Sequence, residues 1–594
     1  MLESLYKYAQ DNELVAVPGF VPKNVRHYIC FSVSGVFLGF ETLEKDAEKI
    51  MCPDIGSLAN GKTKSNIIAE KAAVILNLPD EKTGEYKYAE KQKFYFEALS
   101  EASQHDSSFV PAVNGLKDYY DRILSAFEAD KKLKSGDVMS IKVDGKPLES
   151  SHGYREWWES FRKSFETKKT GKRKRCFITG ELTEPKMTVP PVQGLASVGG
   201  HTKGDSFICF DKDAFRSYGL EKAYNAAVSE EAVTGMNAAL LELMKAAPRL
   251  AGAKNIHWFS QKPEYDVFDT LDTGLDLDLG FEPDPEDQQL RFETLKTEDE
   301  RKVRDLFAFM MNKSRPEMPE NRYYMMSLSG VNGRVMIRSY DEGTYDSLCN
   351  NIRAWFDDIA IYEKGYGYRY PKLFGIYSRM LKFSNDNRKL GERIDAELSG
   401  LSSQIMNCIL HNTALPDSVA SKVLMYIRSD LYSRTSDDSK RSRINIDLTA
   451  SRILKAWLNR KYRKEKKEEY LIMDKLNENS PSKAYQTGRL MAIYAAIQRK
   501  ALGDVGAGVV ERYYTSACTA PALVIGKLAT ASQYHLSKLE NKDKIFYSRL
   551  LQEIGCKIGT SLPKTFSLEE QSQFALGYYF QNSEMYTKST VTEE

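Results

Sequence analysis

Four consecutive basic residues form a concentrated positive charge in the sequence. They directly precede a stretch in which Thr-Gly, Gly-Gly and Lys-Gly pairs separate short apolar pieces, a pattern typical of turn-rich β structure. Basic side chains beside exposed backbone suit a phosphate backbone better than a small molecule. The candidate phosphate ligands of this region are Lys172, Arg173, Lys174, Arg175, His201 and Lys203.

A polar segment near the N-terminus, residues 60–66, reads Asn-Gly-Lys-Thr-Lys-Ser-Asn. Nothing in it can build a core, so we predict an exposed loop. Its side chains are of the types that contact base edges and phosphates, although a plain solvated loop has the same composition. The candidates for base recognition are Asn60, Lys62, Lys64 and Asn66.

Two more basic groups lie further along the chain. An Asn-Gly pair at residues 332–333 separates two alternating runs and predicts a β-hairpin, with Arg334 and Arg338 on one face of its second strand. That face either lines a groove or is simply an exposed edge. Residues 428–467 indicate either a solvated helix face or a surface for single-stranded DNA. The candidates there are Lys440, Arg441, Arg443, Arg460, Lys461 and Arg463.

Motifs for catalysis are incomplete. Residues 199–206 approach a phosphate-binding loop, but Asp205 stands where such a loop needs lysine. His105 and Asp106 form an isolated pair, whereas a metal-dependent nuclease needs several converging ligands. The eight cysteines include no Cys-x-x-Cys pair, so neither a zinc ribbon nor a dense disulfide framework is indicated. We therefore expect a binding protein rather than an enzyme, without a metal or another cofactor.

Bulk properties describe an ordinary globular protein. The chain has 594 residues, which predicts two to four domains, and its net charge of +2 means that nucleic-acid affinity must come from local patches. No apolar run approaches the length of a membrane span and no secretion signal is visible, so we expect a cytoplasmic protein.

The sequence predicts both helices and strands around these residues, and together these elements indicate an α+β protein. A mixed α/β body with β-hairpins near residues 28–40 and 139–145 precedes a C-terminal all-α helical bundle. We predict an N-terminal region over 1–150, a central β-rich and α region over 151–373, and the helical bundle over 374–594. The acidic residues 266–287 predict a loop that lies away from any nucleic acid.

Several segments carry a family resemblance that spans nearly the whole chain. The sequence resembles the large subunit of type I-C CRISPR surveillance complexes (Cascade), the Csd family. The matching segments are the opening 1–20 and residues 176–181, 206–219, 225–230, 321–340 and 485–540.

In that family a separate small subunit also comes from the same gene. Purine-rich codons for residues 466–469 ahead of Met473 suggest an internal start here, which would yield residues 473–594.

The resemblance implies a role in recognising target DNA. Such a subunit reads the protospacer-adjacent motif (PAM) of the duplex, promotes R-loop formation and holds the non-target strand while guide RNA pairs with the other strand. The implied partners are crRNA, target DNA, the crRNA-end-binding, repeated backbone and small subunits, and a transiently recruited helicase-nuclease. The N-terminal loop 60–66 is then the candidate motif reader. Two alternatives are a stand-alone metal-dependent nuclease using His105 and Asp106, and an assembly subunit without DNA contact.

Overall fold

The computed structural model describes residues 1–15, 19–43, 50–79, 84–165, 173–263, 266–271, 320–363, 367–368, 370–382, 388–433, 445–503 and 508–586. The chain divides into two compact units. We call residues 2–190 with 208–240 the N-terminal unit, and residues 191–207 with 241–594 the C-terminal unit. Together they form an α+β protein, as the sequence predicts.

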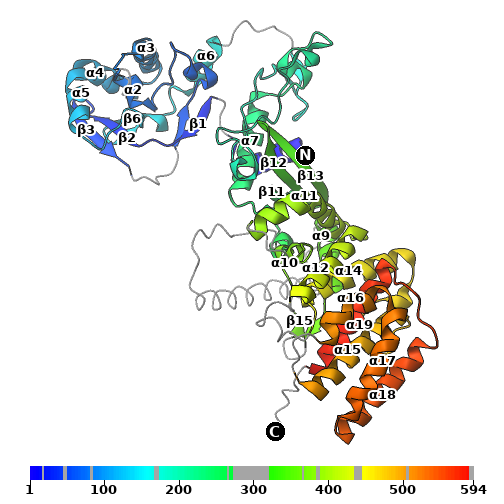
Figure 1. Cartoon of the computed structure of the whole chain (residues 1–594). Helices are drawn as coiled ribbons and strands as arrows, with labels where there is room; N and C mark the ends of the chain where they lie inside the picture. Colours follow the sequence, from blue (N-terminus) through cyan, green and yellow to red (C-terminus); the bar gives the residue numbers. More distant parts are fainter. Residues whose placement is uncertain are drawn as a thin grey trace. The chain divides into compact units, whose positions relative to one another are not determined.

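The N-terminal unit is built around a small mixed sheet (Figure 1). The two predicted hairpins are confirmed, since β2 pairs with β3 and β6 with β7 in antiparallel fashion. Strand β2 also pairs with β6 in parallel, across a long connection that includes helices. Apolar side chains such as Ile29 and Ile141 form the core with Leu99 and Leu116 of the covering helices. The elements are β2 (His27–Phe31), β3 (Phe37–Thr42), β5 (Glu70–Lys71), β6 (Val138–Val143), β7 (Lys146–Pro147), α2 (Ala72–Ile75), α3 (Ala89–His105), α4 (Val110–Asp118) and α5 (Tyr120–Ala129).

Shorter elements complete this unit. Ser229 ends the turn-rich stretch as a helix cap, because its hydroxyl accepts the Ala232 amide at 3.1 Å. The remaining elements are α1 (Leu2–Asp11), β1 (Phe20–Lys23), β4 (Ile50–Pro53), α6 (Arg155–Ser164), β8 (Lys174–Arg175), β9 (Leu182–Thr183) and α7 (Glu230–Lys245), which continues past residue 240.

The C-terminal unit begins with a four-stranded sheet of order β10-β11-β12-β13. The hairpin predicted at Asn332 and Gly333 is confirmed: both residues have positive φ, as a tight two-residue turn requires. The register shifts between Ser327 and Leu328, which pair with Ser339 and Ile337, so Arg338 is the extra residue of a bulge. The strands are β10 (Arg249–Leu250), β11 (Ala253–Phe259), β12 (Arg322–Val331) and β13 (Arg334–Thr344).

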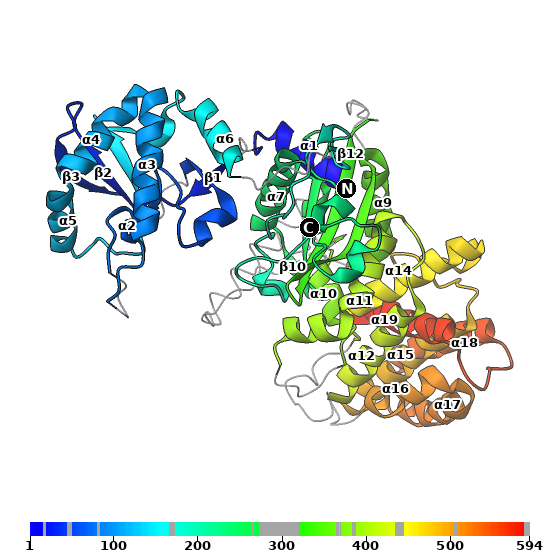
Figure 2. The ribbon, with the colours of Figure 1, turned by 90° about the horizontal axis from the view of Figure 1, so that it is seen from above.

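Helices predominate in the remaining described part of this unit, which confirms the predicted helical C-terminal part. Figures 1 and 2 show α15 and α19 side by side among the other C-terminal helices. One hydrophobic core runs through the unit, from Leu250 to Phe580. The elements are α9 (Tyr345–Ile359), β14 (Tyr362–Glu363), β15 (Gly367–Tyr368), α10 (Leu373–Ser378), α11 (Leu390–Leu410), α12 (Asp417–Ser433), α14 (Leu448–Glu465), α15 (Lys483–Leu502), α16 (Val509–Thr519), α17 (Pro521–Ser537), α18 (Asn541–Ile558) and α19 (Leu568–Tyr586).

Some predictions about organisation stay predictions. The division at residues 150 and 373 and the separate piece 473–594 concern independent folding and translation. Most of the acidic segment, residues 272–287, lies outside the described residues, and so do 264–265. Among the described helices, none combines the length and apolar character that crossing a membrane requires.

Candidate nucleic-acid interface

In the C-terminal unit, the glycine-rich loop 199–206 packs on the tip of the β12–β13 hairpin. The Ser206 amide donates to the Gly333 carbonyl at 2.8 Å, and the Val335 amide donates to the Ser206 carbonyl at 3.0 Å. At Gly199 a side chain would lie 2.7 Å from the Gly330 carbonyl oxygen, so only glycine fits this approach. The fold therefore joins two segments that are separated by about 130 positions in the sequence.

Four residues predicted to contact nucleic acid lie on this loop and hairpin, which we call the loop–hairpin surface: His201, Lys203, Arg334 and Arg338. All four side chains are exposed, and His201 lies beside Gly333 of the turn. The Arg338 Nε donates to the Ser329 hydroxyl at 2.8 Å. Within the described residues no carboxylate pairs with any of the four, so the charges of Lys203, Arg334 and Arg338 face solvent.

The interior of loop 199–206 is already occupied by the protein's own anion. Asp205 is fully buried, and its carboxylate accepts the His201 amide at 3.1 Å. A phosphate-binding loop needs such amides for its ligand. Because the buried carboxylate takes that place, the loop presents His201 and Lys203 outward and is not arranged to enclose a nucleotide phosphate.

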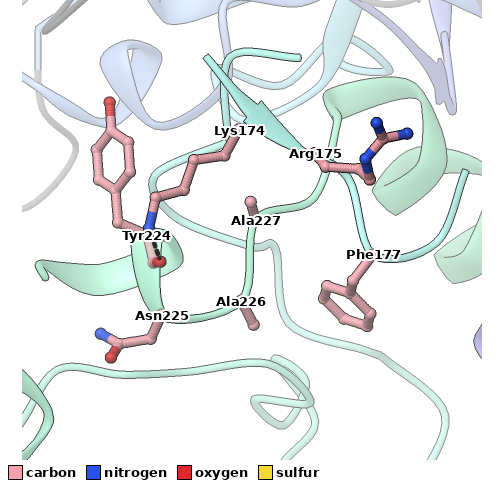
Figure 3. A pocket seen from close by; sticks show the side chains of 7 residues that line it. All are labelled: Lys174, Arg175, Phe177, Tyr224, Asn225, Ala226 and Ala227. Carbon is pink, nitrogen blue, oxygen red and sulfur yellow. Dashed lines mark hydrogen bonds between the residues drawn. The ribbon is translucent and has the colours of Figure 1, made fainter. Parts of the chain in front are cut away.

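In the N-terminal unit, the other predicted basic cluster borders a pocket of about 410 Å³ (Figure 3). Lys174 lies on its rim, donates from Nζ to the Tyr224 carbonyl at 2.9 Å and lies 5.6 Å from the centre of the Tyr224 ring. Arg175 is exposed and donates one N–H to the Gly180 carbonyl at 2.6 Å. Arg173 is also exposed, whereas Lys172 lies outside the described residues. The other lining residues are Phe177, Asn225, Ala226 and Ala227.

Cys176 fixes the two walls of this pocket relative to each other. Its sulfur accepts the amides of Thr179 at 3.5 Å and Ser229 at 3.4 Å, and the Phe177 amide donates to the Ala227 carbonyl at 3.0 Å. Burial by itself raises the pKa of the Cys176 thiol, but hydrogen bonds, chiefly from Thr179 and Ser229, outweigh it and hold that pKa below its ordinary value. The cysteine thus has a structural role under the pocket.

The loop 60–66 of the same unit exposes fewer side chains than its composition suggests. Lys62 is exposed, and no described residue pairs with it. Lys64 is half-buried, with its ammonium 3.6 Å above the ring centre of Phe165. Asn66 is only 7% exposed and accepts the Ile55 amide at 3.0 Å. Burial therefore makes Asn66 a support of the loop and corrects its prediction as a base-reading residue. The Asn60 side chain lies outside the described residues.

In the C-terminal clusters, burial corrects the prediction for one residue, Arg460. Arg460 is buried, and its Nε donates to the carboxylate of Asp358 at 2.7 Å. Arg463 pairs with the same carboxylate, and Lys461 lies 3.4 Å from the Glu569 carboxylate. A buried, paired guanidinium cannot reach DNA without unfolding, so Arg460 belongs to the core. The other cluster lies outside the described residues: Lys440, Arg441 and Arg443.

The histidine–aspartate pair of the nuclease alternative has structural partners. The His105 ring stacks on Trp157, with centroids 5.9 Å apart. Asp106 accepts hydrogen bonds from Ser108 and Ser151. Burial raises the pKa of Asp106, but these hydrogen bonds outweigh it and keep that pKa below its ordinary value. Among the described residues, no three His, Cys, Asp or Glu side chains come together as metal ligands.

Sequence reasoning missed the aromatic and amide groups of the pocket. Phe177 is 50% exposed although it follows a buried cysteine, and Tyr224 and Asn225 come from a segment almost fifty residues later. The available signal was the aromatic residue that directly follows the basic tetrad and Cys176. An exposed ring beside basic residues is a common feature of single-strand binding surfaces.

Comparison with protein-family models matches residues 2–586 to the family described as CRISPR-associated protein (Cas_Csd1). No curated protein matches the chain. The family match covers nearly the whole sequence and is consistent with the large subunit of a type I-C Cascade. The chain therefore belongs to the Csd1 family of CRISPR-associated proteins.

Proposed function

We propose that this chain acts in a type I-C Cascade as a non-catalytic large subunit that grips target DNA through the loop–hairpin surface. The observation that carries the proposal is that the loop–hairpin surface exposes the cations Lys203, Arg334 and Arg338, together with His201, without a described carboxylate partner. Unpaired cations on this loop and hairpin can replace the counterions of a DNA backbone.

In this proposal, the grip supports PAM recognition and R-loop formation. Guide RNA supplies the sequence test by base pairing, and the protein holds the duplex and then the non-target strand. The crRNA-bearing subunits are the stable partners, and a helicase-nuclease recruited to the R-loop performs the cleavage. Family membership supports this division of labour, and the structural roles of His105 and Asp106 disfavour a nuclease site at that pair.

Removing two charges from the loop–hairpin surface tests the grip. For Lys203→Ala/Arg334→Ala in the purified complex, we expect weaker binding to duplex targets. The slope of log affinity against log salt should become shallower by about 1.8, because each lost phosphate contact contributes about 0.9. Binding is measured at several salt concentrations with matched and unmatched target sequences.

Arg322→Ala is the matched control, because Arg322 lies at the other end of the same hairpin and pairs with Glu342 at 3.3 Å. We expect its salt slope to equal that of the unmodified complex. An unchanged slope for the double variant would contradict the proposed grip and favour an assembly subunit without DNA contact. Equal changes in the double variant and Arg322→Ala would also contradict it.

We further propose that Lys62 contributes to reading the PAM. It is the lysine of loop 60–66 that remains exposed, whereas Lys64 is held over Phe165. For Lys62→Ala we expect the preference for the correct motif to fall by about 1–3 kcal/mol if the lysine reads a base. Lys64→Ala is the control and should leave this preference unchanged. Equal weakening on all motifs by Lys62→Ala would show a phosphate contact instead.

A further inference from the structure

The pocket of the N-terminal unit combines three kinds of chemistry that one nucleotide requires. Phe177 presents a half-exposed ring, and Arg175 presents a guanidinium of which one N–H is bonded to Gly180. The Asn225 amide donates one N–H to the Lys222 carbonyl at 3.1 Å, which leaves its oxygen and a second N–H for a ligand. Figure 3 shows the Phe177 and Asn225 side chains on the two sides of Ala226.

The floor and the charge of the pocket favour a flat, anionic ligand. Ala226 and Ala227 line it between the larger residues, so a planar ring can approach the backbone closely. None of its seven lining residues is acidic, and Lys174 and Arg175 are cationic. The volume of about 410 Å³ lies near the lower end of the range for small-molecule sites, about 300–1,000 Å³. A single nucleobase with its phosphate has this size and charge.

The pocket is also preformed. In this respect it differs from an aromatic side chain that is exposed outside any pocket. Cys176 accepts the amides of Thr179 and Ser229, which follow the two lining segments, and Lys174 is tied to the Tyr224 carbonyl at 2.9 Å. Tyr218, in contrast, is 91% exposed on the same unit and does not line the pocket. Because these hydrogen bonds already hold the backbone of both segments, ligand binding needs to order little of the main chain.

From these contacts we infer that the pocket binds one unpaired nucleotide of single-stranded nucleic acid. The base stacks on Phe177, Asn225 contacts the base edge, and Arg175 contacts the phosphate. The inference rests on the proposed function, because it names where a strand released from the duplex is held. A paired base is excluded, since its faces are covered by its neighbours in the helix. A free mononucleotide has the same chemistry and is the other possible source.

The test is direct binding of the purified full-length chain to an oligonucleotide that carries 2-aminopurine, whose fluorescence falls when the base stacks. We expect Phe177→Ala to weaken single-strand binding by about fivefold or more and to abolish the quenching. Phe177→Leu keeps the apolar bulk and should lose the quenching as well. Arg175→Ala should make the single-strand salt slope shallower by about 0.7.

Two controls make the result specific. Tyr218→Ala removes a more exposed ring outside the pocket and should leave both affinity and quenching unchanged. Binding of Phe177→Ala to a duplex of the same sequence should also remain unchanged. A mononucleotide such as AMP, added in excess, should compete poorly, whereas strong competition would identify a free-nucleotide site and overturn the single-strand assignment.

Failure of this inference is distinguishable from failure of the proposed function. If Phe177→Ala binds single strands as the unmodified chain does, or loses duplex binding equally, the pocket assignment is wrong. The duplex salt slope of Lys203→Ala/Arg334→Ala is a separate readout from a different unit of the chain. A changed slope there with no effect of Phe177 would retain the proposed grip and reject only the nucleotide pocket.

Discussion

Gly488→Ala is expected to lower the free energy of unfolding of the full chain by more than about 3 kcal/mol, at the upper end of overpacking effects. Gly488 lies on α15, where an added Cβ would overlap the carbonyl oxygen of Phe574 on α19 and lie 2.8 Å from the Tyr578 amide nitrogen. Gly577 on α19 makes the reciprocal approach to Tyr485. Urea unfolding followed by circular dichroism measures the change.

The large effect follows from how this contact is surrounded. Every residue from 484 to 497 of α15 is buried, so α15 cannot move away from α19 without disturbing packing on all its sides. The obstructing atoms belong to the backbone of a helix, which cannot rotate aside as a flexible side chain can. Both helices lie within residues 473–594, so a separately produced C-terminal piece should suffer the same loss.

Two other glycines provide matched controls in neighbouring helices. Gly526 on α17 and Gly555 on α18 have open space where a Cβ would be placed. Alanine there should leave stability unchanged or raise it by up to about 1 kcal/mol, because alanine favours a helix over glycine. Similar losses for all three variants would contradict the close crossing of α15 and α19 as the cause.

Features set by local sequence were predicted well. The Asn332-Gly333 turn and the β2–β3 hairpin each depend on a few neighbouring residues, and both occur as expected. The long C-terminal helices follow from periodic apolar patterns with few interruptions. These elements give the fold class, but they do not determine which distant segments meet.

Features set by tertiary contacts were not predicted from the sequence. Asn66 and Arg460 are polar types that are usually exposed, yet both are buried. Asn66 accepts the amide of Ile55, and Arg460 pairs with Asp358, which is 102 positions away in the chain. The joining of loop 199–206 to the hairpin depends on close backbone contact at Gly199 and Gly330, which composition does not reveal. The pocket likewise needs residues 174–177 and 224–227 to meet, so its chemistry became visible only in three dimensions.

Asp358→Ala is expected to destabilise the full chain by about 3–5 kcal/mol, because it leaves the Arg460 guanidinium buried without a counter-charge. Both side chains of this pair are only 1% exposed. Arg460 also donates from Nη1 to the carbonyls of Cys408 at 2.6 Å and Thr413 at 3.0 Å, but neutral carbonyls do not balance its charge. Urea unfolding again provides the measurement.

Two comparisons isolate the buried charge as the cause. Asp357→Ala, one position earlier on α9, removes a side chain that is 63% exposed and should change stability by no more than about 0.5 kcal/mol. Combining Asp358→Ala with Arg460→Met should recover much of the loss, because the double variant no longer buries the Arg460 charge without its carboxylate partner. If the double variant is no more stable than Asp358→Ala, the buried charge is not the source of the instability.

The same pair of residues also separates a structural role of Arg460 from a DNA-binding role. A guanidinium that contacts phosphate would add to the salt dependence of DNA binding, whereas one buried against Asp358 contributes to folding alone. We therefore expect the folded Asp358→Ala/Arg460→Met complex to keep the salt slope of the unmodified complex. A salt slope shallower by about 0.9 would show that Arg460 contacts a DNA phosphate. It would contradict the placement of this residue in the core.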